Sequence, residues 1–155
     1  MYSRILVPFD GSDAAAAGLE QAIKLGKSPG AKLRLVYVVN ELILASPYIV
    51  GTLDAGQFAA DVVETFRERG RELLSQAESL VRRHGLEPEC TLLEAIGSQA
   101  AQVIVRHAKE WPADIIVMGT HGRRGIRRIV MGSDAEQVLR TSPVPVLLVR
   151  SANVA

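Results

Sequence analysis

The sequence contains a single cysteine, Cys90, and only 5% of its residues are aromatic. One cysteine excludes an intramolecular disulfide and fits a reducing compartment. The 18 Lys and Arg nearly balance the 17 Asp and Glu, so no global field attracts nucleic acid or an anionic membrane. No apolar run approaches the ~20 residues of a membrane span, and residues 5–9 are too few for the apolar region of a signal peptide. These absences predict a cytoplasmic protein with no nucleic-acid or membrane partner.

The motifs of several catalytic and metal-binding classes are also missing. No H-E-x-x-H or Cys/His cluster is present, which argues against a transition-metal site. Asp10, Ser12 and His121 do not suggest a hydrolase triad, because the nucleophile elbow G-x-S-x-G is absent. The tripeptide Gly26-Lys27-Ser28 imitates the end of a P-loop, but Gln21 occupies the position of the required first glycine.

What is present is the composition of one soluble globular domain. Apolar residues make up 48% of the chain and charged residues 23%, which is not the signature of disorder. A length of 155 residues corresponds to about one domain. No linker or repeat divides the chain, so we expect a single domain over residues 1–150 and a short tail over 151–155.

Strand-like and helix-like segments alternate along the chain. Short apolar runs predict strands at 5–9, 33–39, 90–93, 115–118 and 144–149. Helical spacing predicts helices from the turn at 10–13 to residue 26, and over 58–83, 98–110 and 133–140, with Gly97-Ser98 capping the third. Residues 40–56 read as a loop. Gly70, inside the second helix, is expected to weaken it by roughly 1 kcal/mol relative to alanine.

This alternation predicts an α/β fold with a parallel sheet and helices on both faces. Pro145 cannot donate to a strand ladder, so the last strand is expected at a sheet edge. The residues leave two strand orders open, 3-2-1-4-5 and 2-1-3-4-5. In the first, the order reverses between strands one and four, which places Asp10 opposite Met118 and Gly119 at the position where such sheets bind ligands.

One segment combines glycines, basic residues and a hydroxyl between a strand and a helix. It runs from Gly119-Thr120-His121-Gly122-Arg123-Arg124-Gly125 to Gly132-Ser133-Asp134. Glycine lets the backbone approach a ligand closely, and the free amides at a helix N-terminus favour an anion such as phosphate. Ser133 is placed either to cap the helix or to donate its hydroxyl to a phosphate oxygen. The alternative interpretation is a glycine-rich turn followed by an ordinary serine N-cap.

The spacing of Gly119, Gly122, Gly132 and Ser133, G-x2-G-x9-G-[ST], resembles the nucleotide-binding signature of the universal stress protein family. The opening segment 5–12 and the closing segment 143–149 are also similar to that family, so the resemblance covers essentially the whole chain. It implies a three-layer, Rossmann-like fold with the sheet order 3-2-1-4-5. It also implies ATP with Mg²⁺ as ligand, and a homodimer joined through the last strand, Val144 to Val149.

The resemblance further implies where the nucleotide would lie along the strand ends. Asp10, after Pro8 at the end of the first strand, would lie near the phosphates or their Mg²⁺ ion. The backbone of Val38, at the end of the second strand, would meet the adenine. Met118 and Gly119 would lie along the ribose.

The glycine-rich segment would surround the phosphates, through Gly122, Arg123, Gly132, Ser133 and the Asp134 amide, with His121 and Arg124 adding positive charge. Position 134 departs from the family pattern, in which a small or aliphatic residue is common. The Asp134 carboxylate could repel ATP or help to hold Mg²⁺. It could also simply stabilise the first turn of a helix, by ~0.3–1 kcal/mol.

Three functions follow from these patterns. The first is an ATP-binding regulatory module with an unknown protein partner, and it is favoured by the glycine motif. The second is a slow ATPase or phosphotransferase, for which neither a base nor a lysine aimed at the γ-phosphate is evident. The third is a dimeric scaffold without nucleotide. The apolar segment 42–50 is interpreted either as a lid on the core or as a partner surface.

Overall fold

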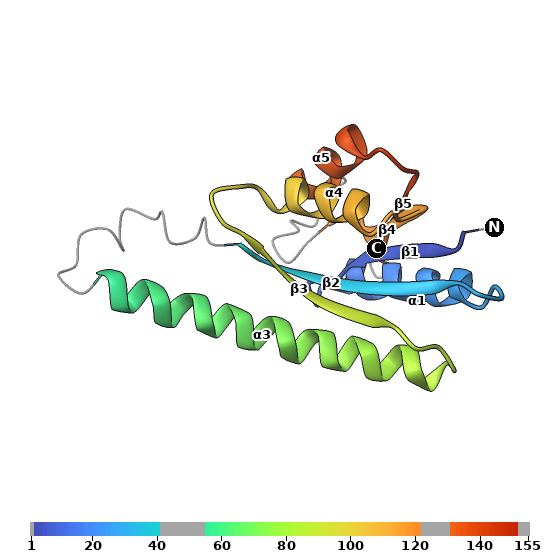
Figure 1. Cartoon of the computed structure of the whole chain (residues 1–155), viewed down its shortest axis with the longest axis horizontal. Helices are drawn as coiled ribbons and strands as arrows, with labels where there is room; N and C mark the ends of the chain where they lie inside the picture. Colours follow the sequence, from blue (N-terminus) through green and yellow to red (C-terminus); the bar gives the residue numbers. More distant parts are fainter. Residues whose placement is uncertain (1, 41–54, 122–130, 152–155) are drawn as a thin grey trace.

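The computed structural model describes residues 2–40, 55–121 and 131–151. Strands and helices alternate within these ranges (Figure 1). The strands are β1 (Arg4–Pro8), β2 (Lys32–Asn40), β3 (Glu89–Ala95), β4 (Ile115–Gly119) and β5 (Val146–Val149). The helices are α1 (Asp13–Gly26), α3 (Ala55–Arg83), α4 (Ala100–Glu110) and α5 (Ser133–Thr141).

The strands form one parallel sheet with the order β3-β2-β1-β4-β5. Ile5 of β1 pairs with Leu33 of β2 on one side and with Ile115 of β4 on the other. Helices α1 and α3 cover one face of the sheet, and α4 and α5 cover the other (Figure 1). The three-layer α/β fold and the order 3-2-1-4-5 are therefore confirmed.

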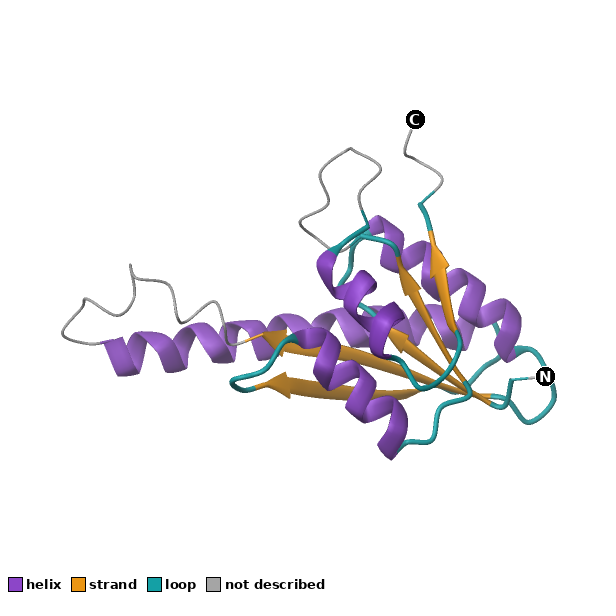
Figure 2. Ribbon diagram, turned by 90° about the horizontal axis from the view of Figure 1, so that it is seen from above, coloured by secondary structure: helices purple, strands orange, loops and turns teal. Residues whose placement is uncertain are grey.

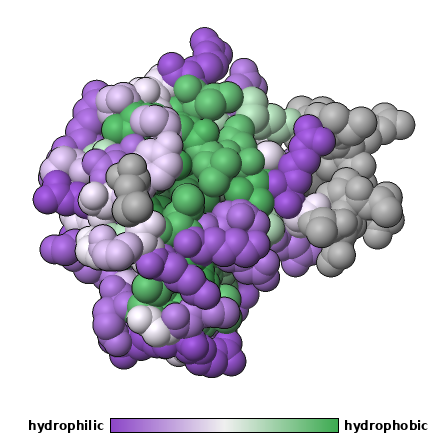
Figure 3. Space-filling view, turned by 90° about the vertical axis from the view of Figure 1, so that its right-hand side faces the viewer, coloured by the Kyte–Doolittle hydropathy of each residue, from purple (hydrophilic) through white to green (hydrophobic). Residues whose placement is uncertain are grey.

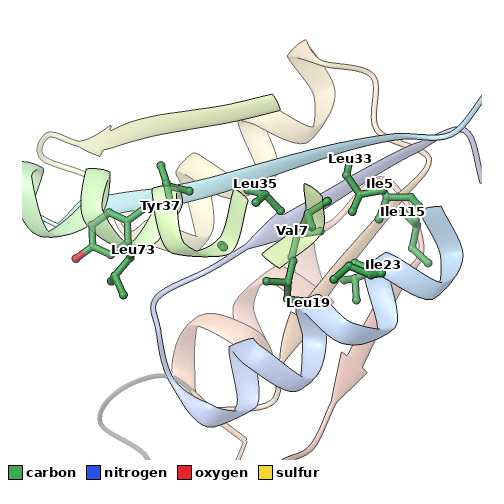
Figure 4. Close-up of a cluster of buried hydrophobic side chains, with 14 of the residues drawn as sticks. Ile5, Val7, Leu19, Ile23, Leu33, Leu35, Tyr37, Leu73 and Ile115 are labelled. Atoms are coloured by element: carbon green, nitrogen blue, oxygen red, sulfur yellow. The ribbon is translucent and has the colours of Figure 1, made fainter. Parts of the chain in front are cut away.

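One apolar core lies on each face of the sheet, because successive side chains of a strand point to opposite faces. Ile5 and Val7 belong to the core under α1 and α3, which Figure 4 shows with Leu19 and Leu73 from those helices. Leu6, between them in sequence, belongs to the core under α4 and α5. All three strand residues are fully buried, which explains why β1 reads as a continuous apolar run.

Helix α3 begins earlier than the spacing of apolar residues predicts. It starts at Ala55, so Gly56 lies in the helix and not in the predicted loop. Residues 41–54, which include the apolar segment 42–50, lie outside the described residues. Asn40, also assigned to that loop, ends β2. The predicted start of this helix was wrong because a glycine near a helix end can belong either to the helix or to the preceding loop.

Helix α4 begins later than predicted. Gly97 adopts φ +60° and continues a turn beyond β3, so Gly97 and Ser98 do not cap the helix. The N-cap is Gln99, and its N–H donates to the side-chain oxygen of Gln102 at 3.3 Å. β3 is longer than predicted and extends to Ala95.

The two edges of the sheet differ in chemistry. The edge formed by β5 is apolar, and Leu147 remains 37% exposed there. Figure 3, which views the right-hand side of Figure 1, shows hydrophobic residues gathered on the side where β5 lies. The opposite edge, β3, has Glu89 paired with Arg34 and Glu94 paired with Arg67 at 2.7 Å.

Pro145 precedes β5 and lies outside the strand, but the prediction of an edge strand is confirmed.

Within the described ranges, no helix is both long enough and apolar enough to span a membrane.

Candidate functional site

The strand order reverses between β1 and β4, since β2 and β3 continue from β1 while β5 continues from β4. Figure 2 shows the strands fanning out in one general direction, so the carboxyl ends of β1 and β4 lie at the same end of the sheet. In open parallel sheets, ligands bind beyond the strand ends at such a reversal. The segments that follow β1 and β4 therefore form the candidate site.

The turn after β1 is fixed by three hydrogen bonds. Phe9 donates its N–H to the carbonyl of Val36 at 2.8 Å, which holds the turn against β2. Ser12 donates its N–H to Oδ1 of Asp10 at 3.0 Å. The Ser12 Oγ accepts the N–H of Ala15 at 3.1 Å and so caps α1. Asp10 is thus held in a defined position, half-buried, directly before a helix N-terminus.

The end of β4 lies unusually close to the start of α1. A Cβ on Gly119 would be 2.6 Å from the carbonyl carbon of Ala14, well inside van der Waals contact. A Cβ on Gly18 would lie 3.3 Å from the backbone nitrogen of Gly119. Gly119, which the resemblance assigns to the ribose, is therefore also required for the packing of helix on strand.

A hydrogen bond joins the two turns. The Ser12 hydroxyl donates to the backbone carbonyl of His121 at 3.4 Å. The hydroxyl thus serves the helix cap and the His121 backbone, and among the described residues no hydrogen bond links it to the His121 ring as a hydrolase triad would require. The segments after β1 and after β4 are instead connected as parts of one surface.

The His121 side chain is held by its neighbour and has one unsatisfied nitrogen. The Thr120 hydroxyl lies 2.8 Å from Nδ1 of His121. Nε2 is buried and is the one buried side-chain nitrogen or oxygen without a hydrogen-bond partner in the described ranges. A buried polar atom without a partner is costly, so Nε2 suits a ligand that hydrogen-bonds there. Sequence reasoning missed Thr120, whose only signal is a hydroxyl directly before the histidine.

The glycine-rich segment leaves the sheet and returns at the same point. Thr120 donates its N–H to the carbonyl of Val149 at 2.9 Å, and its own carbonyl accepts the N–H of Gly132 at 2.9 Å. Gly122, Arg123 and Arg124 lie outside the described residues, together with the rest of 122–130. The structure nevertheless brings Gly132 beside Thr120, and with it the N-terminus of α5.

Ser133 does not cap α5. It is the first residue of the helix, and Gly132 is the N-cap, with no side chain to offer to the first amides. This excludes one of the two roles expected for Ser133 and leaves its exposed hydroxyl available. Asp134 is exposed in the first turn, where a carboxylate stabilises the helix. A hollow lined by Ser133, Glu136, Gln137, Arg140 and Thr141 follows the outer side of α5 and does not coincide with the strand ends.

Pro8 and Val38 occupy the carboxyl halves of β1 and β2. Pro8 pairs with Val36, two residues before Val38 on β2. Val38 is half-buried and packs against the core under α4 and α5, as does the buried Met118. Both strand-end positions therefore have the apolar surroundings that a base or a ribose can contact.

Two kinds of catalytic group can be considered among the residues that the structure describes, a metal centre and a reactive thiol. Within the described residues, no three His, Cys, Asp or Glu side chains gather as a metal site would require. The thiol of Cys90 lies on β3, and partial burial together with the nearby charge of Glu78 raises its pKa to about 11. It stays protonated at neutral pH and is a poor nucleophile.

The chain is similar to known proteins in both sequence and fold. Residues 1–150 match the model of the universal stress protein family. A universal stress protein of Methanocaldococcus jannaschii is 34% identical over 150 residues, which cover 97% of this chain and 83% of the relative. The crystal structure of a universal stress protein from Burkholderia pseudomallei superposes with a TM-score of 0.74 at 34% identity, covering 96% of each chain.

A third similar protein is known with a ligand. The universal stress protein of Archaeoglobus fulgidus in complex with dAMP superposes with a TM-score of 0.64 at 28% identity. The match covers 96% of this chain and 98% of that one. The family match over residues 1–150 and the 34% identity of the archaeal relative lead to one conclusion. The chain belongs to the universal stress protein family.

Proposed function

We propose that the chain binds ATP with Mg²⁺ and acts as a nucleotide-dependent regulatory module in a stress response. The observation that carries the proposal is the junction of three segments at the strand-order reversal. The turn after β1 is bonded to His121, and Thr120 is bonded to Gly132 at the N-terminus of α5. The dAMP complex of the archaeal family member supports an adenine nucleotide as the ligand.

The phosphates would lie at the start of α5. A helix N-terminus carries partial positive charge and amides without intrahelical partners, both of which favour phosphate. Gly132 leaves room for the phosphates, and the hydroxyl of Ser133 can donate to an oxygen. Nε2 of His121 would supply a further hydrogen bond. Gly122, Arg123 and Arg124 are proposed to complete this side of the site.

The adenosine and the metal ion would lie along the strand ends. We assign the base to the backbone of Val38 near Pro8, and the ribose to Met118 and Gly119. The described residues offer no cluster of carboxylates, so Mg²⁺ would take most of its ligands from phosphate oxygens and water, with Asp10 as the protein contribution. Bound Mg²⁺ would neutralise phosphate charge, including repulsion from Asp134.

A slow ATPase or phosphotransferase using the same pocket is the alternative. Ser12 is engaged as a helix cap, and the Cys90 thiol lies elsewhere on the sheet with a raised pKa. Turnover measured with purified protein separates the alternatives. A regulatory module binds ATP and releases it unchanged on the time scale of a binding experiment.

Thermal unfolding tests the proposal directly. A ligand at ~100 times its Kd stabilises the native state by about 2.7 kcal/mol. For a domain of this length, this raises the unfolding midpoint by roughly 5–10 °C. We expect this shift with Mg-ATP, and a smaller one when EDTA removes Mg²⁺. Acid extraction and chromatography should first establish that the protein is free of nucleotide. Nucleotide-free protein that shows no shift in millimolar Mg-ATP would contradict the proposal.

A further inference from the structure

Away from the candidate site, three side chains meet around the guanidinium group of Arg34. Arg34 of β2 donates from Nε to the Glu89 carboxylate of β3 at 2.8 Å, and a second nitrogen contacts the same oxygen. Its guanidinium carbon lies 4.6 Å from the ring centroid of Trp111, which follows α4. Its third contact is Nε2 of His107 on α4, at 3.3 Å from NH1.

The contact between Arg34 and His107 defines the protonation state of the imidazole. A guanidinium can only donate hydrogen bonds, and it stays charged at every physiological pH. Nε2 of His107 must therefore accept, which requires a neutral ring with its hydrogen on Nδ1. Protonation of His107 would place a second donor and a second positive charge 3.3 Å from the guanidinium.

The surroundings of His107 would do little to stabilise a positive charge on its ring. Burial and the positive charge of Arg34 lower its pKa, and Glu110, on its own helix, opposes them only in part. Glu110 lies 3.9 Å from Arg106, and Glu89 of β3 is already paired with Arg34 and influenced by Lys32 of β2. On the neighbouring α5, Glu136 and Arg140 face each other at 3.8 Å.

The same residues hold the carboxyl end of α4. Trp111 donates its N–H to the carbonyl of His107 at 2.9 Å, and Ala113 donates to Ala108 at 2.8 Å. Movement of His107 away from Arg34 thus acts on the last turn of the helix and on the ring of Trp111.

We propose that Arg34, Glu89, His107 and Trp111 form an acid-sensitive latch, which fastens the end of α4 to β2 and β3 while His107 is neutral and opens when His107 is protonated. The latch is separate from the candidate nucleotide site and works without nucleotide. It gives the chain a response to acidification in the range where histidine titrates.

The direction of the effect on stability follows from the lowered pKa of His107. Above the ordinary histidine pKa of about 6.5, the ring is neutral in both the folded and the unfolded chain, and the latch is closed. As the pH falls below that value, the unfolded chain takes up the proton first, so stability is lost. As the pH passes the lowered pKa, His107 is protonated in the folded chain and the latch opens.

Trp111 is the one tryptophan in the sequence, so its fluorescence reports the latch alone. We expect acrylamide quenching of Trp111 in the full-length protein to increase between about pH 7 and about pH 5, with a midpoint below about 6.5. Amide exchange at Trp111 and Ala113 should accelerate over the same range relative to His107→Gln at the same pH. Because Arg34 also lowers the pKa of Glu89, that carboxylate titrates below this range.

Three variants give the proposal its controls. His107→Gln keeps an acceptor for Arg34 but cannot be protonated, and should abolish the transition. His84→Gln, at an exposed histidine just beyond α3, should leave it unchanged. Arg34→Gln removes the guanidinium that holds the latch closed, so Trp111 should already be readily quenched at neutral pH, which also tests the latch if His107→Gln does not fold. A folded wild type whose Trp111 shows no transition, or a transition that survives His107→Gln, would overturn the proposal.

Discussion

Gly119 and Gly132 belong to one sequence motif, but the fold uses them in different ways. A side chain on Gly119 would overlap the backbone of Ala14, so glycine is needed there for packing. Gly132 has φ −61° and ψ 147°, an extended conformation that any residue adopts. Its glycine is therefore not explained by backbone strain, and close approach of a ligand is the reason that we propose.

We expect substitution of the two glycines to differ in its effect on stability. Gly132→Val should lower nucleotide affinity by at least about tenfold, while a poorer N-cap costs only ~1 kcal/mol of stability. Gly119→Ala should in addition destabilise the fold by ~1–3 kcal/mol, because the added methyl group would overlap the backbone of Ala14. Calorimetric titration with Mg-ATP and urea unfolding measure the two effects. Wild-type affinity in Gly132→Val would show that this glycine serves only the turn.

Among single residues, the sequence allowed prediction of those whose residue type is unusual at the end of a strand. The glycine spacing and Asp10 could be found because glycines and a carboxylate at strand ends are recognisable without a structure. The roles of Thr120 and Gly18 could not be predicted from the sequence. Their roles depend on a side-chain hydrogen bond and on a helix-to-strand distance, and both are set by tertiary packing.

Among the elements, α3 shows how packing can reverse an intrinsic preference. Gly70 weakens an isolated helix, yet a Cβ at this position would lie 2.5 Å from Cδ1 of Tyr37 and 2.6 Å from Cδ1 of Leu92. Tyr37 is buried and has little room to move. The glycine therefore lets α3 lie directly on β2 and β3.

We predict that Gly70→Ala destabilises the protein. Helix propensity alone would give a gain of roughly 1 kcal/mol, whereas overpacking a buried contact costs ~1–3 kcal/mol. Ser75→Ala on the exposed side of the same helix is the control, and should stabilise by a few tenths of a kcal/mol. Urea unfolding of both variants decides the sign. A more stable Gly70→Ala would mean that Tyr37 and Leu92 can move aside.

The types and the order of elements were predictable, but several ends were not. Buried parallel strands such as residues 5–7 are apolar on both faces and stand out in the sequence. The start of α4 depends on a positive φ at Gly97 and on a hydrogen bond between Gln99 and Gln102, neither of which changes apolar spacing. The strand order also required information beyond local pattern, because both doubly wound orders satisfy the same alternation.

For the whole molecule, we propose a homodimer joined through β5. Val146 and Leu148 pack against the core of their own chain, so charged substitutions there would disturb the fold. Leu147 is more exposed and is the better probe of an interface.

Leu147→Glu should therefore yield a folded monomer, because it places a charge where two apolar edges would meet. Arg150→Glu, exposed and just outside the strand, should leave the dimer intact. Sedimentation equilibrium at micromolar concentration measures the association. A wild type that sediments as a monomer would exclude the dimer, and a dimeric Leu147→Glu would place the interface elsewhere.

The difference between the two sheet edges limits how many copies of the chain can assemble through them. A sheet that can pair with another copy at both of its edges can assemble into an open-ended fibre, whereas a sheet that can pair at one edge forms only dimers. Here the β3 edge has its carboxylates paired with arginines of the same chain, and the β5 edge is apolar. If β5 strands join, each pair ends in charged strands on both sides, so assembly terminates at two copies and the sheet does not extend into a fibre.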